Sequence, residues 1–298
     1  MNARRSLSIV CLSIAALSLP HRAAAQGNSQ NHGRAARPPA TAPAAAPVPV
    51  QPAGTGVRNF GAWLDDTSIV DPHTGWAGFS LGYWKSPLGH QIDMPSSDIG
   101  YGLSRSVQVG FTMPYYRSRF GTDAATGLGD VYLNAKINLV DPTKNPQHAG
   151  VAVIPVVEIL SGLPDGSNRW HWGAPVSAEI LVGSARVYGA GGYFSRGAIF
   201  GSGAVEWTSA RNYTVTGSLT RSYSLADDPL SDALGLNRHR LDASGSVSRA
   251  IAKSVAIYGG VARTLSRADA NSTRISLNAG FVTFFNGPVQ TPARRKRK

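Results

Sequence analysis

The sequence predicts an all-β protein, a closed antiparallel transmembrane β-barrel of about 12 strands. The first observation is a series of strand-like segments, each roughly ten residues long, in which apolar and polar side chains alternate. The second is an apolar N-terminal run that is typical of a secretory signal peptide. The third is that no later apolar run reaches the roughly 20 residues that a membrane-spanning helix needs.

The segment 127–139, GLGDVYLNAKINL, shows the alternation most clearly. Its apolar side chains fall on one parity and its polar side chains on the other, and a strand sends successive side chains to opposite faces. A helix would scatter the same apolar side chains around its circumference. The pattern therefore predicts a strand with one apolar and one wet face. The same parity recurs in 107–113, 213–220, 241–248 and 274–281.

A soluble β-sandwich or a secreted repeat fold is the alternative to a barrel, because sandwich strands alternate too. Sandwich cores need large side chains that interdigitate across about 10 Å. The apolar faces here are rich in Ala and Gly, which a lipid environment tolerates and a sandwich core does not. A closed sheet also pairs every backbone N–H and C=O group in hydrocarbon. These arguments favour a barrel, with the lipid bilayer of the cell outer membrane as its surroundings.

Residues 1–25 form the predicted signal peptide. Met1–Arg5 carries two arginines, Ser6–Pro20 is mostly apolar, and Ala23–Ala25 has the small-x-small arrangement that signal peptidase accepts. A membrane anchor is the alternative, but the apolar run is shorter than the roughly 20 residues that a span requires. The single cysteine, Cys11, lies inside this signal, so the mature chain is predicted to hold no disulfide and no thiolate metal site.

Three further regions follow the signal. Residues 26–57 are rich in Pro and Ala and predict a disordered, extended linker on the periplasmic side. Residues 58–287 form the predicted barrel domain, and within it 58–73 could fold into the lumen as a plug anchored by Trp63. Residues 288–298 form a basic tail that ends in RRKRK.

The net charge of +12 is concentrated at the two ends of the chain. Without the signal-peptide arginines (Arg4, Arg5 and Arg22) and the five basic residues of the tail, roughly +4 remains, an ordinary balance. The remaining basic residues are not interleaved with stacking aromatics, so nucleic acid is not an expected partner.

The connections between the predicted strands differ in length along the chain. Short turns are expected around Arg105, Ser184, Ala210 and Ala252. Short turns on one rim and long loops on the other are typical of an outer-membrane barrel. Two connections fit this pattern less well, since 141–149 is long where a short turn is expected and 194–197 is short. The predicted long loops are 86–96, 117–127, 161–171, 224–239 and 265–273; the predicted strands lie near 75–85, 97–104, 106–116, 128–139, 150–160, 172–183, 185–194, 198–208, 211–223, 240–249, 254–264 and 274–285.

Two local features bear on barrel assembly. Pro155 and Pro175 each remove a ladder donor, so both are expected at bulges or near a rim. The last strand reads NAGFVTFF, and Gly280, Phe281 and Phe285 match the pattern of terminal strands that the barrel-assembly machinery recognises during biogenesis. Those aromatics could equally form a girdle at the membrane interface.

The stretch DIGYGLSRSVQVGFTMPYYRS and the later TGLGDVYLNAKINL together resemble a known family. It is the family of outer-membrane β-barrels associated with transport in aromatic-compound (phenol, meta-pathway) degradation. The resemblance covers most of 64–139 and implies a barrel that passes a small-molecule solute, hydrophobic or aromatic in character. The matching residues are Tyr101, Gly102, Leu103, Pro114, Tyr115, Gly127, Leu128, Gly129 and Asp130.

Polar residues on the wet parity are expected to line the lumen. Charges in a narrow interior should pair with opposite charges, so a structural ion network is one interpretation. A polar pathway whose charges set selectivity is the second, and an active site is the third. The predicted lumen-lining residues are Asp130, Tyr132, Asn134, Lys136, Asn138, Glu158, Glu179, Glu206, Arg240, Asp242 and Arg274.

We expect no enzyme and no cofactor. The domain's histidines are His73, His90, His148, His171 and His239, and none lies in a recognisable nucleophile motif. Asp65, Asp66 and Asp71 could ligate Ca²⁺, but they lack EF-hand spacing, so a solvated turn is the favoured reading and no metal is predicted.

The predicted function is an outer-membrane channel or transporter for small, hydrophobic or aromatic molecules. A closed structural or adhesion barrel, which binds partners through its long extracellular loops, is the alternative. A barrel hydrolase with a histidine at its rim is the third class.

Overall fold

The computed structural model describes residues 61–120, 123–145, 147–161, 168–209, 213–227, 229–233, 235–270 and 272–286. The predicted signal peptide (1–25), linker (26–57) and basic tail (288–298) lie outside these residues. Within the described part, no helix has the length and apolar character of a membrane span.

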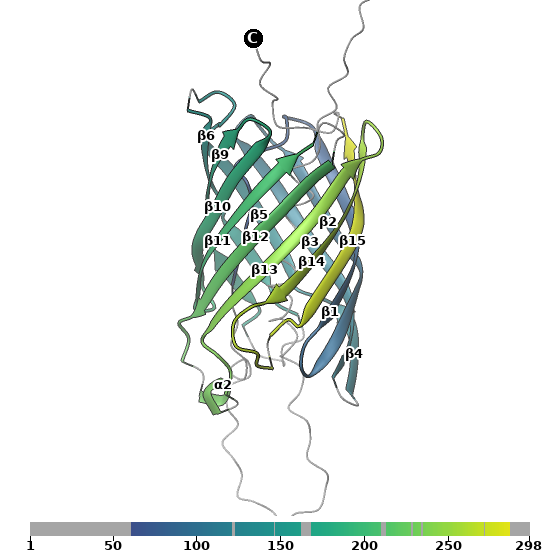
Figure 1. Ribbon diagram of the computed structural model, residues 1–298, viewed down its shortest axis with the longest axis vertical. Helices are drawn as coiled ribbons and strands as arrows, with labels where there is room; N and C mark the ends of the chain where they lie inside the picture. The colour runs from purple at the N-terminus through teal and green to yellow at the C-terminus, as the bar shows by residue number, and fades with distance from the viewer. Residues whose placement is uncertain are drawn as a thin grey trace, which may run out of the picture.

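The described chain is a closed antiparallel β-barrel of 12 strands, which confirms the predicted fold class (Figure 1). The ring closes because β1 (Gly75–Lys85) pairs with β15 (Ile275–Phe285) along its whole length, from Gly75↔Phe285 to Lys85↔Ile275. The other segments are β2 (Gly89–Gly102), β3 (Val107–Phe120), β4 (Asp123–Leu128), β5 (Val131–Val140), β6 (Ala149–Val153), β7 (Val156–Ile159), β8 (Trp170–Gly173), β9 (Val176–Val182), β10 (Ala185–Phe194), β11 (Ala198–Thr208), β12 (Tyr213–Ser224), β13 (His239–Ala250) and β14 (Val255–Thr264), with one short helix, α2 (Pro229–Ala233).

Three of the 12 strands are divided in two, which accounts for the 15 segments of the sheet: β4 with β5, β6 with β7, and β8 with β9. Pro155 and Pro175 lie at two of these divisions, in the middle of the wall. The expectation of a bulge or a rim position is wrong, because the strand register is the same on both sides of each proline, as in Ile137↔Val153 and Asn134↔Val156. The ladder continues across both, because Pro155 O accepts from Ala135 N at 3.0 Å and Pro175 O accepts from Ile154 N at 2.8 Å.

The barrel has two different rims. We call the rim where β1 begins and β15 ends the terminal rim, and it also carries the turns at 103–106, 183–184 and 251–254. The opposite rim, the loop rim, carries the connections at 195–197, 225–238 with α2, and 265–274 (Figure 1).

Two of the predicted long loops are mostly strand. The prediction of a loop at 86–96 is wrong because β2 already begins at Gly89, and Pro95 is accommodated where the pairing with β3 shifts register between Asp93 and Ser96. The loop predicted at 117–127 is instead a hairpin of β3 and β4, which pair from Tyr115↔Leu128 to Phe120↔Asp123. Its polar composition suits a hairpin that extends toward water, where neither face needs apolar side chains.

The two faces of the wall differ in chemistry as the alternation predicted. On β12, Leu219 is 53% exposed and Val215 is 47% exposed on the outer face, whereas Thr216 and Thr220 on the inner face are buried. The same outward apolar band continues on β14 and β15 at Val261, Leu277 and Phe281. A closed wall with an apolar exterior and a polar interior places the protein in the outer membrane.

Candidate functional site

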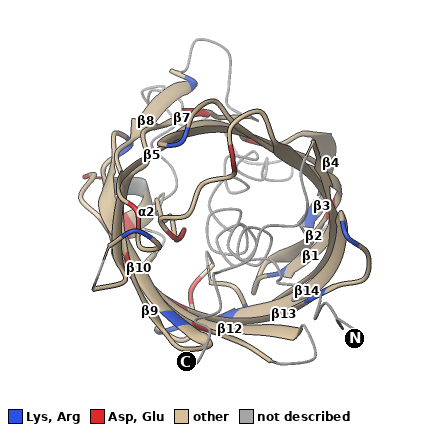
Figure 2. Ribbon diagram, turned by 90° about the horizontal axis from the view of Figure 1, so that it is seen from above, with Lys and Arg blue, Asp and Glu red and all other residues tan. Residues whose placement is uncertain are grey.

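Residues Gly61–Thr74, which we call the strap, lie inside the barrel (Figure 2). At the terminal rim, His73 N donates to Gly102 O at 2.9 Å, and Val70 N donates to Gln108 Oε1 at 3.0 Å. At the other end, Gly61 lies directly against the ring of Phe194, the last residue of β10 at the loop rim. The strap therefore crosses the lumen from one rim to the other.

Apolar side chains of the strap are buried against the wall at three levels. Ala62 packs with Phe194, Phe200, Ala190 and Ala198 near the loop rim. Leu64 packs with Tyr188 and Ala204 at the next level. Val70 packs near the terminal rim, in a cluster that also holds Trp76, Ala256, Tyr258, Val282 and Phe284.

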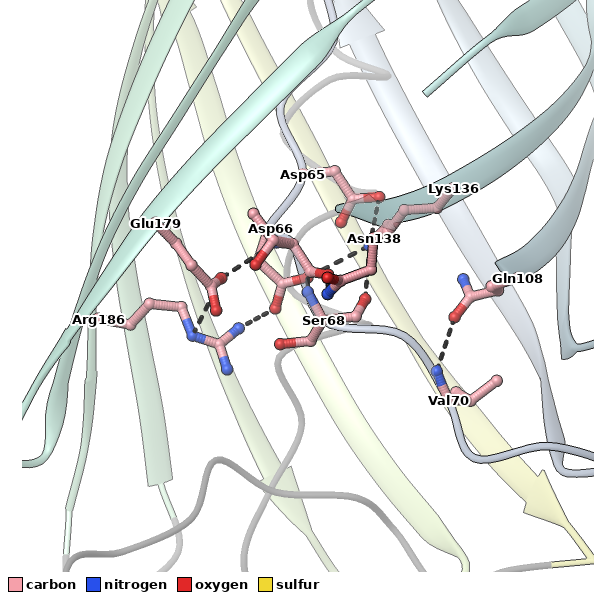
Figure 3. A network of polar contacts seen from close by, with 10 residues as sticks. Asp65, Asp66, Ser68, Val70, Gln108, Lys136, Asn138, Glu179 and Arg186 are labelled. Carbon is pink, nitrogen blue, oxygen red and sulfur yellow. Dashed lines mark hydrogen bonds and ion pairs between the residues drawn. The ribbon is translucent and has the colours of Figure 1, made fainter. Parts of the chain in front are cut away.

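Charged groups hold the middle of the strap, and we call Asp65, Asp66, Lys136 and Arg186 the latch (Figure 3). Lys136 Nζ lies 2.9 Å from Asp65 Oδ2 and 3.2 Å from Asp66 Oδ1. The Arg186 guanidinium contacts Asp66 Oδ2 from the other side, and its Nε lies 3.8 Å from Glu179 Oε2. The latch thus joins the strap to β5 and β10.

Backbone groups of the strap are paired beside the latch. Thr67 N donates to Glu179 Oε2 at 3.1 Å, and Thr67 O accepts from Asn138 Nδ2 at 2.7 Å. Lys136 Nζ also donates to Ser68 O at 3.0 Å. Side chains of the wall therefore satisfy a stretch of strap that has no sheet partner of its own.

A second charged group lies toward the loop rim. Arg196 Nη2, from the turn after β10, lies 3.3 Å from Glu158 Oε1. Burial opposes its charge, but Glu158, Tyr132 and Asp130 together outweigh that effect and raise the pKa of Arg196. Asp130 accepts from Ser161 N at 2.8 Å and from Ser161 Oγ at 3.0 Å.

A third polar group joins β13 to the 265–274 connection at the loop rim. Arg240 Nε donates to Asp242 Oδ1 at 2.9 Å, and Thr264 Oγ1 donates to the same oxygen at 2.6 Å. Thr273 Oγ1 accepts from Trp84 Nε1 at 2.9 Å. Each charge in this group has an opposite or hydrogen-bonding partner, as expected for charges inside a narrow barrel.

Most of the predicted lumen residues are buried on the inner side of the wall. Asp130, Lys136, Glu158, Glu179, Glu206, Arg240 and Asp242 are buried, and Tyr132, Asn134 and Asn138 are partly buried. Arg274 differs from the prediction, because it precedes β15 at the loop rim and its side chain is exposed. Position 274 has the same parity as the inward-facing Ser276, but β15 begins only at Ile275, so the alternation does not yet fix the direction of the Arg274 side chain.

Two of the lumen cations, Arg186 and Arg196, are absent from the predicted set of lumen residues. Arg186 stands on the inward parity of β10, so the alternation could have found it. Arg196 lies in a turn, where alternation predicts no direction, and only the fold brings it to Glu158. Among the described residues, no group of three His, Cys, Asp or Glu side chains is arranged to hold a metal ion.

The inner faces of β12 and β13 carry hydroxyl groups, and we call them the hydroxyl wall. The strap contacts given above involve β1, β2, β3, β5, β9, β10, β11, β14 and β15, and none involves β12 or β13. Ser218 Oγ and Ser244 Oγ lie 2.6 Å apart across the two strands. The wall consists of Thr214, Thr216, Ser218, Thr220, Ser222, Ser224, Ser244, Ser246 and Ser248.

The chain is similar to known proteins in its structure, but no family model and no curated relative matches it. Among solved structures, the COG4313 outer membrane channel from Pseudomonas putida F1 matches at 12% identity over 74% of this chain and 98% of that chain, with a TM-score of 0.56. The NanC porin matches at 10% identity over 70% of this chain and 98% of that chain, with a TM-score of 0.51. These likenesses show that the chain has the fold of an outer-membrane β-barrel.

Proposed function

We propose that the protein is a passive outer-membrane channel for small molecules, not an enzyme. The hydroxyl wall is the observation that carries this proposal, because it follows β12 from rim to rim and β13 over the half nearer the terminal rim. A barrel filled only for stability would favour apolar or ion-paired side chains inside, whereas hydroxyl groups suit a path wetted by water and solute. The two structural matches named as a channel and a porin agree with this function.

We further propose that aromatic molecules are among the solutes. Aromatic side chains gather on the inner side toward the loop rim, where the Phe194 and Phe200 ring centroids lie 5.7 Å apart. Trp63 of the strap and Tyr132 of β5 form a second pair at 6.4 Å. Aromatic rings stack on one another in offset or edge-to-face geometry. Gly61 and Ala62 of the strap cover Phe194 and Phe200 in this structure, so an aromatic solute would take the place of these strap residues at the mouth of the lumen.

Conductance in planar lipid bilayers tests the channel. The sample is the mature protein refolded in detergent, with its shift in electrophoretic mobility on heating as proof of folding. Discrete current steps are expected, and added aromatic solute should interrupt them. A folded sample that inserts and never conducts would contradict the proposal.

A closed structural barrel is the second candidate, and the strap favours it. The strap spans the lumen and is held at several levels, so it reduces the open cross-section. The same recordings separate the candidates, since a closed barrel predicts no current from a folded, inserted sample.

A further inference from the structure

Among the described residues, the hydrogen-bond and ion-pair partners of the lumen cation Lys136 come from the strap. It extends from β5, is 1% exposed, and contacts the carboxylates of Asp65 and Asp66 together with the backbone carbonyl of Ser68. These three oxygens complete its donor capacity, because an ammonium group has three N–H bonds. Within the described residues, Lys136 forms no ion pair with the barrel wall itself.

Two further wall donors point at the same stretch of strap. Asn138 lies two residues along β5 on the same face, and its amide donates to Thr67 O at 2.7 Å. Arg186 reaches Asp66 from β10 (Figure 3). The wall therefore presents an ammonium, an amide and a guanidinium to the oxygens of residues 65–68, and a carboxylate is the group at their centre.

In the described part of the chain, the barrel wall gives the two cations, Lys136 and Arg186, different numbers of acidic ion-pair partners. Arg186 has an acidic neighbour on the wall, since its Nε lies 3.8 Å from Glu179 Oε2. The ion pairs of Lys136 are both with the strap. If the strap left, Arg186 would keep a partner and Lys136 would lose both carboxylates, which is costly for a charge shielded from bulk water.

We propose that Lys136, Asn138 and Arg186 form a carboxylate-binding subsite of the pore, which the strap fills in cis and from which a solute carboxylate displaces it. This inference rests on the proposed channel function and names the class of solute: small molecules that bear a carboxylate. An uncharged solute of the same shape cannot replace the two ion pairs of Lys136, so it leaves the strap in place.

The covalent link between the strap and β1 determines how much solute is needed to displace the strap. The strap continues directly into β1, so its carboxylates compete at a local concentration of roughly millimolar or above. Displacement should therefore require millimolar carboxylate and should not occur at trace levels.

The first test releases the latch by substitution. The double variant Asp65→Asn/Asp66→Asn removes both strap charges and should raise single-channel conductance several-fold. Asp71→Asn is the matched control, because Asp71 belongs to the same strap but its side chain is exposed near the terminal rim. Wild-type conductance is expected for this control, and each variant must show the mobility shift on heating that marks a folded barrel.

The second test follows the strap without relying on current. Ser68→Cys, in a Cys11→Ser background, places one thiol on the strap beside the latch. Benzoate at millimolar concentration should speed its labelling by a soluble maleimide at least threefold, and uncharged benzamide should not. Lys136→Met should label fast without benzoate and show no response to it, whereas Lys136→Arg, which keeps the charge, should retain the response.

The two tests separate the subsite from the channel. Benzoate-dependent labelling in a protein that never conducts would support the subsite and overturn the channel function. Equal conductance in all variants, with labelling indifferent to benzoate, would overturn the subsite and leave the channel standing. Equal responses to benzoate and benzamide would also overturn it, because the carboxylate would then play no part.

Discussion

The inner surface of the barrel has two contrasting regions: the latch region on β5, β9 and β10, and the hydroxyl wall on β12 and β13. In the latch region, Lys136, Glu179 and Arg186 reach across to a segment more than 60 residues earlier in the chain. On the hydroxyl wall, the contacts are short and local, such as the 2.6 Å pair of Ser218 and Ser244. Charges therefore hold a resident segment on one side, and hydroxyls line the other.

The difference shows two ways in which polar groups are arranged inside one barrel. A buried cation needs a specific partner of opposite charge, so the latch region binds the strap at a defined place. A hydroxyl group exchanges partners with water at little cost, so the hydroxyl wall stays compatible with a changing solvent and solute.

The largest effect should come from a charge on the outer face. Leu219 lies in the middle of β12 with its side chain 53% exposed, and Leu219→Arg should cost about 2–4 kcal/mol of unfolding free energy if that position lies near the bilayer midplane. Ser218→Arg, one residue away on the inner face, should cost far less. Urea titration in phospholipid vesicles measures both, and equal costs would contradict a lipid-facing exterior.

Locking the strap should produce the next largest change. A Cβ at Gly150 would lie directly against Thr67 Oγ1 and 2.8 Å from the Pro142 ring, so a cysteine there requires a small shift of the Pro142 ring. With that shift, we expect the pair Thr67→Cys/Gly150→Cys to form a disulfide between strap and wall in a Cys11→Ser background. We expect reductant to raise the conductance of the oxidised protein several-fold, as the strap regains its freedom. The single variant Thr67→Cys should not respond to reductant, and a double variant that is equally unresponsive would show that the strap does not move.

Narrowing the hydroxyl wall should have a moderate effect. Thr216 points inward from β12 and is 3% exposed, so a conducting state must open beside it. Thr216→Phe should therefore lower single-channel conductance by about twofold by obstructing that path. Val215→Phe places the same ring on the outer face at the adjacent position and should leave conductance unchanged. If both variants conduct alike, solutes do not pass along β12.

The smallest effect should come from an ion pair outside the lumen. Asp141 lies in the turn after β5, and although burial raises its pKa, hydrogen bonds from Lys144 and Thr143 outweigh that effect and lower the pKa below 3.8. Because the folded pKa is the lower one, the stabilisation is present above the unfolded pKa and is lost as the pH falls through the folded value. Asp141→Asn should therefore cost at most about 1 kcal/mol at neutral pH and nothing in strong acid, as urea titrations at both pH values would show.

The sequence predicted the faces of the wall better than the contacts across the lumen. Alternation is a local property of a strand, so the inward directions of Lys136, Glu158 and Glu179 could be read from neighbouring residues. The contact of Arg186 with Asp66 joins residues 120 positions apart, and no local pattern carries that information.

The sequence predicted that residues 58–73 could fold into the lumen as a plug, but it did not predict which of them hold the strap to the wall. Trp63 was predicted as the anchor of a plug, and it does contact Tyr132, but the closest polar contacts of the strap come from Asp65 to Ser68. The sequence predicted a solvated turn at those aspartates. That prediction is wrong for Asp65 and Asp66, whose cationic partners lie on β5 and β10, far away in the sequence. Whether the strap closes the pore stays a prediction.

The wetness of the hydroxyl wall is the claim on which the channel depends, and spin labels along β12 test it directly. Single cysteines at positions 214–220 would carry a nitroxide in the vesicle-bound protein, and power saturation would compare collisions with oxygen and with a water-soluble nickel complex. We predict opposite alternation, with odd positions such as Val215 and Leu219 accessible to oxygen and even positions such as Thr216 and Ser218 accessible to nickel. Even positions that neither reagent reaches would show a closed, dry interior and would contradict the account.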